Sequence, residues 1–130
     1  MRKKGIIDGL KKVFHFTRKG QTTMFDNIIH ADSYDFFDRS GSGLVLAFFY
    51  EHEDHQCRMM EQIIDELASI YCEDDLLILA VDTEQSPDLA AHYGIDSIPM
   101  VLIMKDGRII EAVEGMNPAS VYSNILNYML

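Results

Sequence analysis

Apolar residues follow two different rhythms along the chain, and each rhythm predicts a different kind of element. Leu44–Tyr50 and Leu76–Val81 are apolar without interruption, as strands buried on both faces of a sheet are. Residues 55–71 instead place an apolar side chain every three or four positions, which predicts a helix. The expected buried face of this helix consists of Met60, Ile63, Ile64, Leu67 and Tyr71.

Turn and capping residues indicate the elements that precede the first apolar run. A short extended stretch is expected at Phe25–Ile29. Residues 32–40 are expected to form a helix with Asp32 or Ser33 as its N-cap, because both side chains accept a backbone N–H at a helix start. Gly41–Gly43 then breaks the chain before the strand.

Similar signals follow the second apolar run. Ser86–Pro87 predicts the start of a helix, since Pro is well suited to the first helical position, and Gly94 predicts its end. Asp106–Gly107 is a favoured two-residue turn between antiparallel strands. We therefore expect residues 100–104 and 109–113 to form a hairpin.

A last helix is expected after Asn117–Pro118, with Val121, Ile125 and Met129 on one face. In sequence order, strands then alternate with helices until the hairpin and this last helix. The alternation favours parallel pairing, and the hairpin adds an antiparallel edge. We expect an α/β fold in which helices flank a central mixed β-sheet, formed by one domain at residues 21–130.

The first twenty residues differ in charge from the rest of the chain. Residues 1–20 carry seven Lys or Arg and one Asp, a net charge of +6, whereas residues 21–130 carry four Lys or Arg against twenty Asp or Glu, a net charge of −16. On a helix, the apolar residues of this extension would share one side: Ile6, Ile7, Leu10, Val13 and Phe14. Three roles stay open for this basic amphipathic extension: packing on its own domain or on a second copy, a frayed tail, or an anchor to an anionic membrane surface or a partner.

Composition and cysteine spacing exclude several classes of function. The acidic body is expected to repel nucleic acid, so no nucleic-acid partner is expected. No apolar run approaches the roughly 20 residues needed to cross a membrane. Cys57 and Cys72 form neither a CxxC motif nor a zinc spacing, which favours a reducing, cytoplasmic setting, with peripheral membrane attachment through the extension left open. His52, Asp54, His55 and Cys57 match no strong metal pattern, so we expect no metal and no cofactor.

Three segments together resemble the thioredoxin family. IIHADSYDFF resembles the family's first strand and helix, and LVLAFFY resembles the strand that leads into its active site. YGIDSIPMVLIMKDGRIIEAVEG resembles the family pattern Y-G-I-x-x-I-P-T…K-x-G…x-x-G, with Gly94, Pro99, Gly107 and Gly115 at the family's spacing. The resemblance runs from about Asn27 to the C-terminus and implies a thioredoxin fold behind the basic extension.

The resemblance also implies where an active site would lie, and the sequence departs from the family there. The family reads W-C-G-P-C-K where this chain reads Glu53-Asp54-His55-Gln56-Cys57-Arg58. Asp54 stands in place of the attacking cysteine, and Cys57 keeps the place of the resolving cysteine. Phe48 replaces the family's buried acidic residue. Because these features differ together, a natural loss or change of activity is expected.

By the same resemblance, the Ile98–Pro99 bond would be cis and would face the loop. Ile98 would then offer its backbone to an extended polypeptide, with Gly115 and the loop residues Glu53, His55 and Gln56 as the remaining candidate binding residues. The alternative is that Pro99 only shapes the edge of the sheet.

Thiol chemistry is limited by what remains in this loop. Dithiol exchange needs one thiolate to attack and a second to release the mixed disulfide, and Asp54 cannot attack in that way. Cys72 is expected roughly 20 Å or more along the helix, too far to form a disulfide with Cys57. Asp54 is well suited to cap the helix, and Cys57 is either a partly buried structural cysteine with a raised pKa or a reactive single thiol.

Three functions follow as hypotheses. The leading one is a redox-degenerate, thioredoxin-like module that binds or regulates a polypeptide through the groove beside Pro99. The second is a weak single-cysteine thiol–disulfide oxidoreductase that acts through Cys57 in redox homeostasis. The third is a membrane-surface adaptor that docks through residues 1–20. The oligomeric state stays open.

Overall fold

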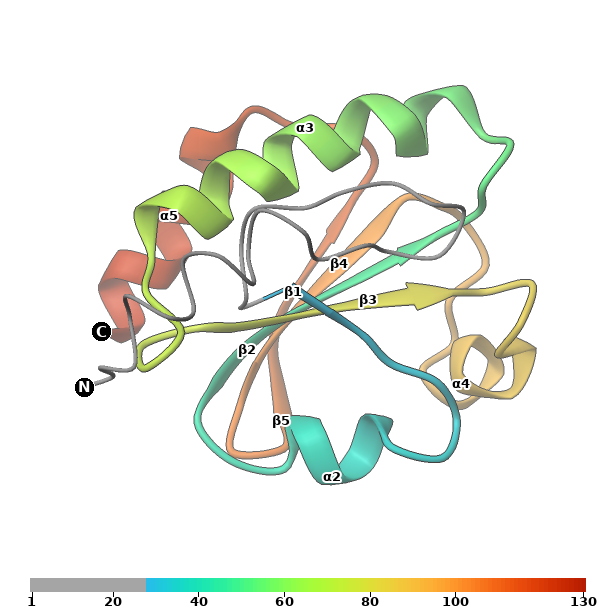
Figure 1. The fold of residues 1–130 in the computed structure, drawn as a ribbon, viewed down its shortest axis with the longest axis horizontal. Helices are drawn as coiled ribbons and strands as arrows, with labels where there is room; N and C mark the ends of the chain where they lie inside the picture. Colours follow the sequence, from blue (N-terminus) through green and yellow to red (C-terminus); the bar gives the residue numbers. More distant parts are fainter. Residues whose placement is uncertain (1–27) are drawn as a thin grey trace, which may run out of the picture.

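The computed structural model describes residues 28–130, so the basic extension and most of the expected stretch at Phe25–Ile29 lie outside the described residues. The elements along the chain are β1 (Ile28–His30), α2 (Phe36–Ser40), β2 (Leu44–Tyr50), α3 (His55–Ile70), β3 (Leu77–Asp82), α4 (Pro87–His92), β4 (Met100–Lys105), β5 (Arg108–Glu114) and α5 (Ala119–Met129). This is the order that the sequence predicts. Figure 1 shows α3 and α5 on one side of the sheet and α2 and α4 on the other.

The five strands form one mixed sheet in the order β1-β3-β2-β4-β5. β3 pairs in parallel with β1 and β2, whereas β4 pairs antiparallel with β2 and β5. Asp106 and Gly107 turn the β4–β5 hairpin with φ values of +51° and +84°, as this kind of turn requires. The predicted α/β architecture with a mixed central sheet and flanking helices is confirmed.

The apolar run of β2 is explained by its central position, because both faces of this strand are covered. Leu46, Phe48 and Tyr50 point into the cluster beneath α3 and α5, while Val45 and Phe49 point into the cluster beneath α2 and α4. Successive side chains of a strand alternate between faces, so two buried faces need an uninterrupted apolar sequence. Every residue of β2 is buried.

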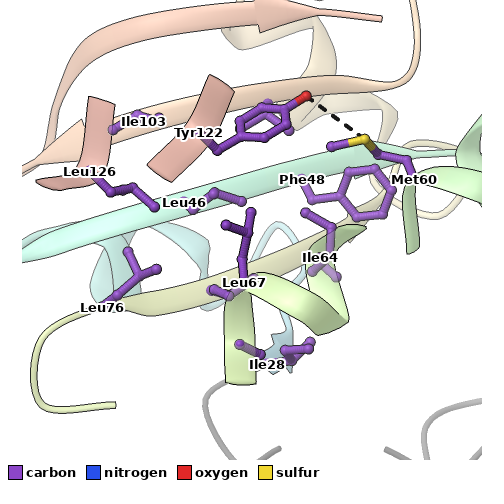
Figure 2. Close-up of a cluster of buried hydrophobic side chains, with 14 of the residues drawn as sticks. Ile28, Leu46, Phe48, Met60, Ile64, Leu67, Leu76, Ile103, Tyr122 and Leu126 are labelled. Atoms are coloured by element: carbon purple, nitrogen blue, oxygen red, sulfur yellow. Dashed lines mark hydrogen bonds between the residues drawn. The ribbon is translucent and has the colours of Figure 1, made fainter. Parts of the chain in front are cut away.

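The larger cluster joins α3 and α5 to the sheet, as Figure 2 shows. Met60, Ile64 and Leu67 of α3 lie on the predicted buried face, and Ile63 is half-buried at its margin. The Tyr122 hydroxyl from α5 donates to the Met60 sulfur over 3.7 Å (Figure 2).

One sequence-based expectation for a helix is wrong in detail. α2 begins at Phe36, not directly after Asp32, because the Asp32 carboxylate accepts the backbone N–H groups of Tyr34 and Asp35 and holds a separate turn there. On α5, the most deeply buried side chains are those of Ala119, Tyr122 and Leu126, while Val121, Ile125 and Met129 flank them half-buried.

Candidate functional site

The candidate loop joins β2 to α3 at the carboxyl end of the parallel strands, where α/β folds commonly bind ligands. β2 ends at Tyr50, and α3 begins at His55. The Asp54 backbone N–H donates to the Glu51 carbonyl over 3.4 Å, which closes a short turn between the two elements. Glu53, His55 and Gln56 are exposed.

Asp54 is the N-cap of α3. Its backbone is extended, with φ −78° and ψ 127°, and its carboxylate accepts the Cys57 backbone N–H over 2.9 Å. This bond satisfies one of the N–H groups that a helix leaves without a partner at its start. The negative charge is also favourable beside the positive end of the helix dipole. The carboxylate is therefore engaged with the helix backbone.

Cys57 is more deeply buried than the sequence suggests, since its side chain is 0% exposed. It belongs to the same apolar cluster as Phe48 and Met60. The pKa of the Cys57 thiol is raised to about 12, mainly by burial; the carboxylates of Asp54 and Glu51 also raise it, and a hydrogen bond with the Glu51 backbone lowers it. Since the thiolate is the nucleophile, this raised pKa disfavours reaction of Cys57 at pH 7.

The second part of the candidate site lies at the start of β4. The Ile98–Pro99 peptide bond is cis, and Pro99 is buried while Ile98 is half-buried. The Pro99 carbonyl accepts the Gly115 N–H over 2.9 Å. Gly115 has φ +80°, a conformation that favours glycine. Ser97 Oγ donates to Glu114 Oε2 over 2.7 Å, which further joins the two ends of the hairpin.

The sheet register brings these two parts to the same end of the molecule. β4 runs antiparallel to β2, and Met100 at its start pairs with Phe49 near the end of β2. The segment at Ile98–Pro99, Gly115 and the loop after Tyr50 therefore lie at the same end of the sheet.

The structure adds two features that sequence reasoning missed. His52 Nε2 lies 3.1 Å from Asp82 Oδ2, and Asp82 is a buried acidic residue at the end of β3, directly across from Tyr50. The sequence signal that could have indicated this pair is Asp82 itself, an acidic residue at the end of the apolar strand β3. A cleft of about 340 Å³ lies nearby, and its lining consists of Glu51, Thr83, Pro87, Ala90, Ala91, Ile95, Asp96, Ser97 and Ile98.

Residues 28–130 contain neither a metal-binding cluster nor a membrane-spanning helix. Within that range, no group of three or more His, Cys, Asp or Glu side chains is arranged to hold a metal ion. Cys57 and Cys72 are both free thiols. No helix in the described part of the chain is long and apolar enough to cross a membrane.

Comparison with known proteins places these features in a family context. The family model described as Thioredoxin matches residues 21–127. A thioredoxin from Bacillus subtilis is 30% identical over 100 residues, which cover 77% of this chain and 95% of that protein. Thioredoxin 1 from Synechococcus elongatus is 36% identical over 83 residues, which cover 64% of this chain and 77% of that protein. A solved structure of a mutant thioredoxin from Halobacterium salinarum matches with a TM-score of 0.71 at 23% identity, covering 78% of this chain and 88% of that one, and supports the fold alone.

Proposed function

Because this chain belongs to the thioredoxin family, we propose that it is a redox-degenerate member that binds or regulates a polypeptide instead of exchanging disulfides. One observation carries this proposal. Asp54, at the place that the family resemblance gives to the attacking thiol, is a carboxylate hydrogen-bonded to the first turn of α3.

The state of Cys57 supports the loss of dithiol turnover. A mixed disulfide formed by one thiol needs a second thiol to release it, and the loop contains only Cys57. With a pKa of about 12, the Cys57 thiol stays protonated at pH 7, and deprotonating it there is unfavourable. The side chain would also have to leave the apolar cluster before it could reach a substrate. These costs weigh against the alternative of a single-cysteine oxidoreductase.

The frame around Pro99 supports polypeptide binding. Ile98 immediately precedes the segment of β4 that pairs with β2 and β5. An extended polypeptide could therefore pair with the Ile98 backbone at this end of the sheet. In this proposal Gly115 and Pro99, joined by a backbone hydrogen bond, contribute one side of a binding groove, and the exposed loop residues Glu53, His55 and Gln56 contribute the other. We define the groove by these six residues.

The sequence-based proposals of a cytoplasmic location and of a role for the basic extension remain part of this hypothesis. A membrane-surface adaptor would depend on residues 1–20, which lie outside the described residues. Co-sedimentation with anionic vesicles, compared between the natural chain and K11Q/K12Q/R18Q/K19Q, addresses that role. Equal sedimentation of the two forms would remove it.

Peptide binding tests the main proposal. The full chain is mixed with a panel of fluorescent, extended peptides, and binding is followed by anisotropy. We expect at least one class of peptide to bind, and Pro99→Ala to weaken that binding at least fivefold because the segment that carries Ile98 would shift. Asp38→Asn on α2 is the control, since Asp38 is exposed on an element far from the groove. Failure of every peptide to bind, or equal binding by Pro99→Ala with an intact circular dichroism spectrum, would contradict the proposal.

A further inference from the structure

The cleft beside the groove combines apolar walls with acidic groups. Its walls come from α4, from the segment that leads into Pro99, and from the ends of β2 and β3. Ile98 lines the cleft and is also one of the six residues that define the proposed groove, so the two adjoin at this residue. A side chain of a polypeptide paired with Ile98 would have direct access to the cleft.

The lining of this cleft suits one type of side chain. Its apolar members are Pro87, Ala90, Ala91, Ile95 and Ile98. The acidic residues Glu51 and Asp96 and the hydroxyl residues Thr83 and Ser97 complete it, and none of the nine lining residues is basic. Lys and Arg carry a cationic head on an aliphatic stem, and they pack the stem on apolar surface while the head stays with polar groups.

Neither carboxylate is neutralised within the described structure. Glu51 is half-buried and Asp96 is exposed, and no ion pair among residues 28–130 involves either of them. A half-buried carboxylate is screened by solvent less than a fully exposed one, so an incoming cation would interact more strongly with Glu51 than with an ordinary surface acid. The groups are thus available to a ligand.

The distribution of charge over the described residues favours the same ligand. The four Lys or Arg residues between 28 and 130 are Arg39, Arg58, Lys105 and Arg108. Lys105 and Arg108 flank the hairpin turn at the opposite end of the sheet, and Arg39 pairs with Asp35 on α2. Arg58 alone follows the candidate loop, on the first turn of α3. Among the described residues, the end of the sheet that holds the groove is therefore predominantly acidic. Its negative electrostatic potential would attract a basic ligand.

We propose that the cleft holds the side chain of a Lys or Arg from the polypeptide bound in the groove, so that the partner presents a basic residue next to the segment that pairs with Ile98. This inference rests on the proposed polypeptide-binding function. It adds a substrate preference that the groove alone does not give: Glu51 and Asp96 select for positive charge, and the apolar walls select for a long side chain.

Matched peptides test the preference. Peptides of about twelve residues, made of Thr, Val, Ser and Gln, differ only in one central residue, which is Lys, Gln or Glu. With the full chain in about 0.05 M NaCl, we expect the Lys peptide to bind about tenfold more tightly than the Gln peptide, and the Glu peptide to bind weakest. Raising the salt to about 0.5 M should narrow the difference, because the carboxylates are screened.

Variants locate the preference in the cleft. The double variant E51Q/D96N should reduce the Lys-over-Gln ratio to below about twofold. The control D38N/E111Q removes the same number of negative charges from exposed positions on α2 and β5 and should keep the full ratio.

The outcomes separate this inference from the function on which it rests. Absence of binding by all three peptides counts against the proposed function. Equal binding of the Lys and Gln peptides, or the same loss of preference in D38N/E111Q as in E51Q/D96N, overturns the cleft proposal and leaves polypeptide binding intact. Tighter Lys-peptide binding by K11Q/K12Q/R18Q/K19Q than by the natural chain would make the basic extension, and not a partner, the occupant of the cleft.

Discussion

Replacing Asp54 by alanine tests whether its carboxylate serves to cap α3. The carboxylate accepts the Cys57 N–H over 2.9 Å at the start of a 16-residue helix. Loss of an N-cap costs about 0.5–2 kcal/mol, and loss of a negative charge at a helix N-terminus costs about 0.3–1 kcal/mol. Because the two effects overlap, we expect Asp54→Ala to lower the free energy of unfolding by about 1–2 kcal/mol. For a domain of this size, the melting temperature should fall by about 5 °C.

Urea unfolding of the full chain, followed by circular dichroism, measures this change. Asp54→Asn keeps an oxygen that can accept the N–H, so it should lose only the charge effect, about 0.5 kcal/mol. Glu53→Ala is the matched control, because Glu53 is the exposed neighbour outside the helix and should matter by less than about 0.5 kcal/mol. Wild-type stability in Asp54→Ala, or an equal loss in Glu53→Ala, would refute the capping role.

Three further predictions concern Cys57, α5 and Gly115. The folded-state pKa of Cys57 is raised from 9.0 to about 12, mainly by burial, so the unfolded chain loses this proton first as the pH rises. The stability that this provides is present below pH 9 and is lost toward pH 12, at about 1.4 kcal/mol per pH unit. In unfolding experiments at different pH, Cys57→Ala should lack this part of the slope. Leu126→Ala should lower the free energy of unfolding in urea by about 2–5 kcal/mol, because Leu126 is wholly buried. Val121→Ala should lower it less than half as much, because Val121 is half-buried. The reverse order would mean that another face of α5 points inward. Gly115→Ala should cost about 1–2 kcal/mol because φ is +80°, and an unchanged melting temperature would show that this conformation is not required.

The central strands and the hairpin could be predicted because their signals are local. Leu44–Tyr50 is apolar at every position since both faces of β2 are covered, and Asp106–Gly107 marks a turn that needs no distant partner. The sequence predicts too early a start for α2 because Asp32 is an equally good cap for a turn, and its pattern does not distinguish a turn from the first turn of a helix.

The features that were missed depend on residues distant in the sequence. His52 and Asp82 lie on segments that follow β2 and β3, and only the parallel register brings them to 3.1 Å. The cleft brings Glu51, which follows β2, together with Asp96, which follows α4 in the sequence. The sequence underestimates the burial of Cys57 for a similar reason, because that burial depends on the cluster that α5 and the sheet complete around α3.

Reduction of insulin disulfides by the full chain, with dithiothreitol as the electron donor, tests the loss of disulfide exchange most directly. Asp54 is engaged with α3 and Cys57 is buried with a pKa of about 12, so we expect the natural chain and Cys57→Ser to reduce insulin no faster than dithiothreitol alone. A catalysed rate in the natural chain that Cys57→Ser abolishes would contradict the proposal and make Cys57 a working thiol.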